Sequence, residues 1–261
     1  MPANQKWTHE ETVLALALYR RTPFGRISST NPDIIKLADL MGRTPGSVAM
    51  KMCNLASCDP TLQKSGRAGL KNCSQLDRSV FKEYSADWES LALEEKQLRS
   101  ELANCPIEEL LRKENRIDID NIPEGEPRES IIKERIEQDF FRSAVLTVYD
   151  SSCCVTGLSE PKLLMASHIK PWADCDAKKE RLNPENGLCL NCLHGKAFER
   201  GLITVDRNYR IVISRHIKDA EMDDKTREWF MSYENRTIIP PSRSAPTKEF
   251  LEYHNDVVFQ G

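Results

Sequence analysis

A segment rich in helix-breaking residues divides this chain of 261 residues into two unlike parts. Residues 122–130 contain Pro123, Gly125 and Pro127, which interrupt any helical periodicity. The apolar spacing before the break is helical, whereas strand-like runs and turns follow a single helical stretch after it. We therefore expect an α+β protein. The predicted parts are a helical domain over 1–82, a charged helical connector and linker over 83–129, and a mixed domain with a C-terminal extension over 130–261.

Three short helices are predicted in the N-terminal part. Thr8 begins the first with a capping box closed by Glu11. Asn31 and Thr44, each followed by a proline, begin the second and third, and Gly42 ends the second. This pattern is typical of a helix-turn-helix unit, whose last helix enters a DNA major groove. The alternative is that the helices only bundle and pack on the rest of the chain.

The charge distribution favours a nucleic-acid partner for the same part. Residues 1–82 carry 12 Lys/Arg against 6 Asp/Glu, although the formal net charge of the whole chain is −3. Such an excess attracts a phosphate backbone, but an ordinary solvated face accounts for it equally well. The residues predicted to contact DNA are Arg43, Ser47, Lys51 and Arg67.

Two further features bear on location. No apolar run approaches the roughly 18 to 20 residues of a membrane span, and the N-terminus lacks the apolar core of a signal peptide. Nine cysteines at irregular positions do not form the framework of a secreted disulfide-rich protein. We expect a cytoplasmic protein without membrane contact, whose cysteines are thiols.

The sequence is most specific in a block of ordered motifs between residues 153 and 205. In chain order they are Cys-Cys-Val-Thr-Gly, Ala-Ser-His-Ile-Lys-Pro-Trp, Asn-Pro-Glu-Asn-Gly-Leu, Leu-His-Gly-Lys-Ala-Phe and Gly-Leu-Ile-Thr-Val. Together they resemble the HNH endonucleases of restriction type, over roughly residues 138–215. The resemblance implies a ββα-metal fold, a double-stranded DNA substrate and a divalent cofactor, Mg²⁺ or Mn²⁺.

Three residues of this block are the predicted catalytic set. His168 follows an apolar run, and its imidazole can accept a proton from water near neutral pH. The resemblance makes His168 the general base and gives Asn186 the role of tying the loop behind it. It makes His194 a metal ligand, and we expect Glu199 to supply a carboxylate to the same metal.

Two departures from the family pattern leave an alternative open. Ser167 stands where many HNH nucleases have a metal-binding aspartate or histidine, and Gly195 stands where related sequences have a second histidine. An inactive HNH fold that serves a DNA-binding regulator is therefore the competing interpretation. For Glu199 the alternative is a salt bridge near Arg200.

A structural zinc ion is a further alternative that the sequence favours less. Cys189 and Cys192 have the spacing of one zinc knuckle, and Cys153 could join them. The second knuckle is incomplete, because Thr156 occupies the position of its other cysteine. Without zinc these cysteines are small buried hydrophobic residues.

The sequence as a whole predicts a metal-dependent DNA endonuclease that cuts foreign DNA. A double-strand cut needs two active sites, which a homodimer supplies by symmetry. A monomeric nicking or mobile-element nuclease is the alternative within the same class.

Overall fold

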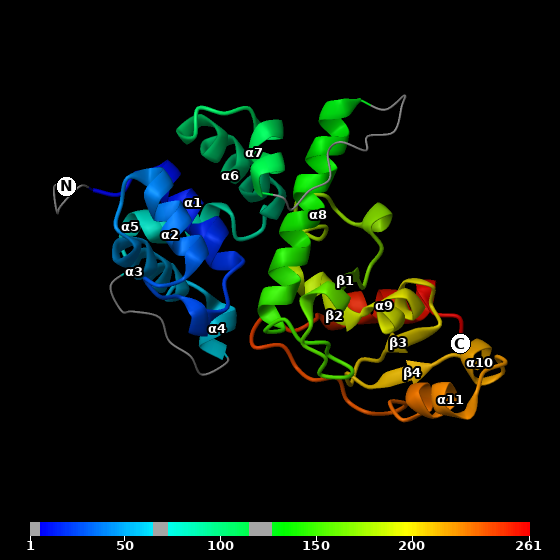
Figure 1. The fold of residues 1–261 in the computed structure, drawn as a ribbon. Coiled ribbons are helices and arrows are strands. Elements are labelled where there is room, and N and C mark those ends of the chain that lie inside the picture. Colours follow the sequence, from blue (N-terminus) through cyan, green and yellow to red (C-terminus); the bar gives the residue numbers. More distant parts are fainter. Residues whose placement is uncertain (1–5, 65–72, 115–126) are drawn as a thin grey trace. The chain divides into compact units, whose positions relative to one another are not determined.

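The computed structural model describes residues 6–64, 73–114 and 127–261. The chain divides into two compact units (Figure 1). The first comprises Met1–Ala144 with Ala177–Leu182, and the second comprises Val145–Asp176 with Asn183–Gly261. The first unit is helical, whereas the second contains two small antiparallel sheets, so the predicted α+β class is confirmed. The three-part division at residues 82 and 129 stays a prediction.

The first unit is built around its first helix, α1. In chain order the unit contains α1 (His9–Arg20), η1 (Phe24–Arg26), α2 (Pro32–Met41), α3 (Pro45–Ala56), α4 (Pro60–Lys64), α5 (Gln75–Glu83), α6 (Trp88–Leu102), α7 (Ile107–Glu114) and most of α8 (Arg128–Val148). Every residue of α1 from Thr12 to Arg20 is buried, because α2, α3, α5 and α6 all pack against it.

The predicted helix ends of this unit are present. The Thr8 hydroxyl accepts a hydrogen bond from the Glu11 amide, and the Glu11 carboxylate accepts one from the Thr8 amide. The two bonds form the capping box of α1. Asn31 caps α2 and Thr44 caps α3 by single bonds, because their side chains accept from the Asp33 and Ser47 amides. Gly42 ends α2 with a φ of 65°, a left-handed conformation that glycine adopts without a steric penalty.

Two ion pairs fix α3 and the turn before it to neighbouring helices. Lys51 Nζ lies 2.5 Å from Asp77 Oδ1, and the two side chains are 5% and 1% exposed. Arg43 makes two bonds of 2.7 Å to the Glu11 carboxylate, and its guanidinium lies 4.2 Å from the centre of the Trp7 ring. Lys51 is therefore part of the interior of the unit, and Arg43 is engaged by Glu11 at the edge of that interior.

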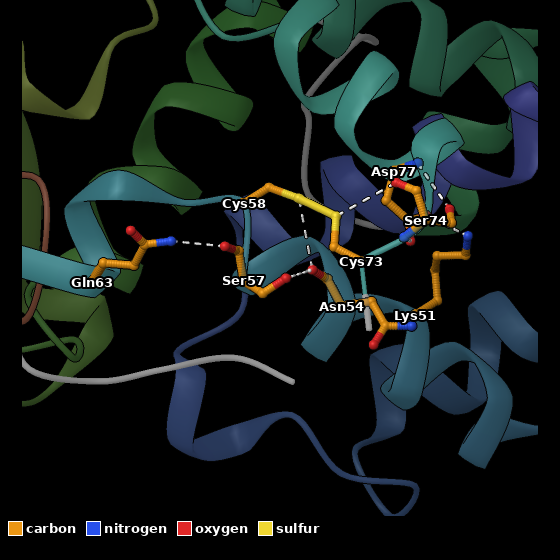
Figure 2. Close-up of a disulfide and its surroundings, with 8 residues drawn as sticks. All are labelled: Lys51, Asn54, Ser57, Cys58, Gln63, Cys73, Ser74 and Asp77. Atoms are coloured by element: carbon orange, nitrogen blue, oxygen red, sulfur yellow. Dashed lines mark hydrogen bonds and ion pairs between the residues drawn. A yellow bond between two sulfur atoms is a disulfide. The ribbon is translucent and has the colours of Figure 1, made fainter. Parts of the chain in front are cut away.

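A disulfide lies beside the Lys51–Asp77 pair (Figure 2). It joins Cys58, two residues after α3, to Cys73, directly before the α5 cap Ser74. All nine cysteines lie in described segments, and the other seven form no disulfide. The expectation of thiols throughout is wrong for this one pair, because the packing of α3 against α5 brings together two residues 15 positions apart.

The second unit contains two hairpins and the helices that cover them. Its elements are η2 (Pro161–Leu163), β1 (Leu164–His168), η3 (Trp172–Asp174), η4 (Pro184–Asn186), β2 (Gly187–Asn191), α9 (Cys192–Glu199), β3 (Ile203–Val205), β4 (Ile211–Ile213), α10 (Arg215–Lys218), α11 (Asp224–Met231), α12 (Lys248–Tyr253) and the π-helical η5 (His254–Val258). Strands β1 and β2 are antiparallel, with Leu164 opposite Asn191 and His168 opposite Gly187. Helix α9 packs on both strands.

The C-terminal segment closes the core of this unit through His254, which is 1% exposed. Its ring stacks on Phe198 at 3.8 Å, and Nε2 donates to the Phe198 carbonyl, so Nδ1 accepts from the Thr204 hydroxyl at 2.8 Å. Gly201 allows η5 to approach, because a Cβ there would lie 2.1 Å from the Val258 carbonyl oxygen. Burial lowers the pKa of His254 to about 4.

A search of the described helices finds none with the length and apolar character that crossing a membrane requires.

We predict that Asp77→Asn destabilises the protein by about 3 kcal/mol, because it leaves the buried Lys51 ammonium without a counter-charge. Urea unfolding followed by circular dichroism measures the change. Asp33→Ala is the matched control, since its ion pair with Lys36 is exposed and is worth only about 0 to 1 kcal/mol. Equal effects of the two variants would contradict the prediction.

We also predict that His254 makes stability depend on pH. The pKa of His254 is lowered from its ordinary value of 6.5 to about 4 in the folded protein, so the unfolded chain binds the proton more readily. The contribution of the neutral His254 to the free energy of unfolding is fully present above pH 6.5 and is lost as the pH falls toward 4. His254→Phe should reduce the slope of unfolding free energy against pH by about 1.4 kcal/mol per pH unit in this window. An unchanged slope in His254→Phe, or a matching drop in the exposed control His216→Phe, would rule this out.

Candidate active site

His168 lies at the end of β1, where the strand leaves the hairpin. Its backbone is paired opposite Gly187, and its side chain is partly exposed. The imidazole makes an edge-to-face contact with Trp172, with ring centres 5.4 Å apart. A histidine that combines a fixed backbone with access to solvent has the geometry that a general base requires.

Asn186 holds the loop that follows His168. Its side chain is fully buried, and Oδ1 accepts from the Lys170 amide at 2.8 Å. Its Nδ2 donates to the Lys170 carbonyl and to Cys175 Sγ, both at 3.2 Å. The Asn186 backbone carbonyl accepts from the Ile169 amide at 2.9 Å. The structure thus brings Asn186 to the loop that it was predicted to tie.

His194 lies in different surroundings from His168. It is 2% exposed, and its ring stacks on Trp229 with centres 4.3 Å apart. Phe230 and Tyr233 contact the ring edge-on. Burial among these groups lowers the pKa of His194 to about 4, so the imidazole is neutral at physiological pH.

Asn191 determines which nitrogen of His194 is available. Asn191 caps α9, and its Oδ1 accepts from the His194 amide at 2.9 Å. The Nδ2 of the same side chain therefore faces Nδ1 of the His194 ring, also at 2.9 Å, and donates to it. The neutral ring then carries its proton on Nε2, which leaves neither nitrogen with a free lone pair for a metal.

Glu199 lies at the last position of α9, on the surface. Its side chain is 37% exposed, and one carboxylate oxygen is 3.4 Å from Lys196 Nζ. A salt bridge was the predicted alternative to metal binding by Glu199. The structure shows such a salt bridge, with Lys196 as the partner instead of Arg200. An exposed pair of this kind contributes little to stability.

The two departures from the HNH pattern face each other. A Cβ on Gly195 would lie 3.2 Å from Ser167 Oγ and 3.1 Å from Met165 Sδ. Ser167 is 1% exposed, and its hydroxyl has no hydrogen-bond partner within the described segments. The contact between these two positions is not visible in the sequence. The alternation of side chains along β1 was the available signal that residue 167 faces a covering helix.

The described residues do not fit the expected metal-ligand set. Within 6–64, 73–114 and 127–261, no three His, Cys, Asp or Glu side chains are grouped closely enough to hold a metal ion. His194 and Glu199, the two predicted metal ligands, are therefore not part of such a group, and their role as ligands stays a prediction.

The cysteines proposed for zinc are not grouped either. Cys153 is buried, and its sulfur accepts from the amides of Thr156 at 3.5 Å and Asn191 at 3.2 Å. Cys189 is also buried, whereas Cys192 is exposed and its thiol donates to the Leu163 carbonyl. The interpretation of these cysteines as small hydrophobic residues fits Cys153 and Cys189.

The four residues predicted to contact DNA have different surroundings in the structure. Arg43 and Lys51 are engaged by Glu11 and Asp77 inside the first unit. Ser47 is partly exposed and lines an open cavity of about 640 Å³ beside Trp7, Met50 and Asn54. Arg67 lies outside the described residues. DNA contact through this set stays a prediction, and the internal ion pairs of Arg43 and Lys51 weigh against those two.

We predict that Asn186→Ala loosens the loop after His168 and destabilises the protein by about 2 kcal/mol, because buried groups at Lys170 and Cys175 lose their partner. Hydrogen exchange at the Lys170 amide and thermal unfolding measure the two effects. Asn183→Ala is the matched control, since that side chain makes a single cap bond to the Glu185 amide, worth about 1 kcal/mol. Unchanged protection at Lys170 in Asn186→Ala would contradict the prediction.

Comparison with known families identifies one domain in the chain. Residues 153–206 match a family model described as HNH endonuclease, HNH_2. No curated protein matches the chain. The matched segment contains β1, β2, α9 and β3, together with His168, Asn186 and His194. The C-terminal part of this chain therefore carries an HNH endonuclease domain, and the predicted resemblance to that family is confirmed.

Proposed function

We propose that the protein is a DNA endonuclease that hydrolyses phosphodiester bonds with His168 as general base. The observation that carries the proposal is the arrangement at the end of β1 in the HNH domain. His168 is accessible there, and Asn186 fixes the loop behind it through three side-chain hydrogen bonds. The fixed loop and strand hold the His168 side chain in one orientation, as a general base requires to accept a proton from a bound water molecule.

The chemistry assigned to this chain's residues is proton transfer. His168 takes a proton from water as the water oxygen attacks phosphorus, and the bond from phosphorus to the leaving sugar oxygen breaks. The imidazolium that forms is exposed to solvent and can release its proton there. HNH nucleases generally use a divalent metal, which offsets charge on the phosphate. Mg²⁺ or Mn²⁺ is expected here, but the described side chains do not supply the ligand set proposed for it.

The biological role proposed is restriction of foreign DNA in the cytoplasm. The basic first 82 residues support a contribution to DNA binding, since phosphate attraction scales with local positive charge. A homodimer would place two HNH domains on the two strands of one site.

A DNA-binding regulator with an inactive HNH domain is the second candidate. The surroundings of His194 favour it, because the ring is enclosed by Trp229, Phe230 and Tyr233 and its Nδ1 is bonded to Asn191. A protein of this kind would bind DNA and show no metal-dependent change in it.

We predict that His168→Ala abolishes cleavage of double-stranded DNA in the presence of Mg²⁺ or Mn²⁺ and leaves DNA binding intact. A loss of at least about 100-fold in rate is expected for removal of a general base. Gel assays with unmodified and modified phage DNA, with metal or chelator, measure cleavage, and mobility shifts measure binding. His216→Ala is the control, because His216 is exposed on α10. Binding without cleavage by the wild-type protein would favour the regulator.

A further inference from the structure

Helix α9 lies so close to β1 that a side chain at position 195 would be crowded against the strand. A Cβ added to Gly195 would lie 3.1 Å from Met165 Sδ, 3.2 Å from Ser167 Oγ and 3.3 Å from Met165 Cβ. Ordinary van der Waals contacts of a Cβ are longer, at 3.4–4 Å. Any side chain at this position would therefore require Met165 and Ser167 to shift by a few tenths of an ångström.

The residues on the facing strand fill the remaining space. Successive side chains of a strand point to opposite faces, so Met165 and Ser167 both point toward α9 and His168 points to the other face of the hairpin. Ser167 is 1% exposed. The surface between the strand and the helix, defined by Met165, Ser167 and Gly195, is called the β1–α9 face below.

The chemistry of the β1–α9 face does not suit a hard divalent cation. Mg²⁺ requires about six oxygen ligands at about 2.0–2.1 Å in nearly octahedral geometry. The face offers one thioether, which is a soft ligand, one neutral hydroxyl, and no side chain at position 195. The nearest carboxylate along the helix, Glu199, is one turn further on and is paired with Lys196 on the surface.

We infer that the β1–α9 face is closed by packing and that the free protein binds neither Mg²⁺ nor Mn²⁺ there. Ser167 and Gly195 act as a fitted pair: the small hydroxyl side chain and the glycine let the helix and strand come together where larger ligand side chains would hold them apart. The inference rests on the proposed function and deepens it by assigning the β1–α9 face a metal-free state in the DNA-free protein, and it also holds for the regulator.

A Mn²⁺ titration in the absence of DNA tests this inference, with the electron paramagnetic resonance signal of free Mn²⁺ as the measurement. We expect no Mn²⁺ binding by the wild-type full-length protein up to millimolar concentrations. The double variant Ser167→Asp with Gly195→His should bind Mn²⁺ with a Kd at least about tenfold below the millimolar limit at which the wild type shows no binding. Ser167→Asp alone is the second variant, in case the double variant does not fold.

The matched control is Ser214→Asp. Ser214 is also 1% exposed, lies in the same unit and has a hydroxyl without a partner in the described chain, but it caps α10 instead of facing α9. This variant should leave Mn²⁺ binding at the wild-type level. A gain in Ser214→Asp equal to that of the Ser167 variants would show that any buried carboxylate suffices, and would overturn the inference.

Two wild-type outcomes separate the inference from the proposed function. One equivalent of Mn²⁺ bound by the wild-type protein and weakened by Ser167→Val would overturn the inference, even if the protein cleaves DNA. Absence of binding by the free protein supports the inference, whether or not DNA is cleaved. Cleavage in the parallel gel assay then decides between the endonuclease and the regulator.

Discussion

The antiparallel register of β1 and β2 is the constraint on which the rest of the candidate site depends. Pairing His168 with Gly187 brings the end of β1 beside the turn that carries Asn186, so one amide side chain can bond the loop after the strand. Pairing Leu164 with Asn191 places the cap of α9 at the other end of the same ladder. A shift of one residue would exchange the two faces of β1 and undo both arrangements.

The same register explains why the two histidines of the site have unlike environments. His168 occupies the open end of the hairpin, whereas His194 lies in the first turn of α9, where Asn191 holds both its amide and its ring. The ring of His194 packs against Trp229 of α11 and against Tyr233 in the turn that follows. We therefore interpret His194 primarily as a link between α9 and α11.

The first unit shows why charge counted along a sequence is a weak guide to a binding surface. Arg43 and Lys51 contribute to the positive excess, yet Lys51 is buried against Asp77 and the partly exposed Arg43 is paired with Glu11. Burying these cations has a desolvation cost, which is offset only when a counter-charge is held at hydrogen-bond distance. Basic residues that are paired within the unit fix the position of α3 and do not contribute to phosphate binding.

The amino-acid sequence by itself determined the features that depend on near neighbours in the chain. The capping box at Thr8, the cap at Asn31 and the left-handed end at Gly42 could be predicted because each is an interaction within a few residues. The HNH domain was likewise identified from the order of its motifs, and the matching family model covers residues 153–206.

Only the tertiary structure decided what depends on residues far apart in the chain. The Cys58–Cys73 disulfide, the Lys51–Asp77 pair and the aromatic surroundings of His194 join segments between 15 and about 40 positions apart. The contact between Ser167 and Gly195 is of the same kind, because it depends on how closely α9 packs on β1. Periodicity shows which face of an element is buried, but it does not show which residue of another element lies against that face.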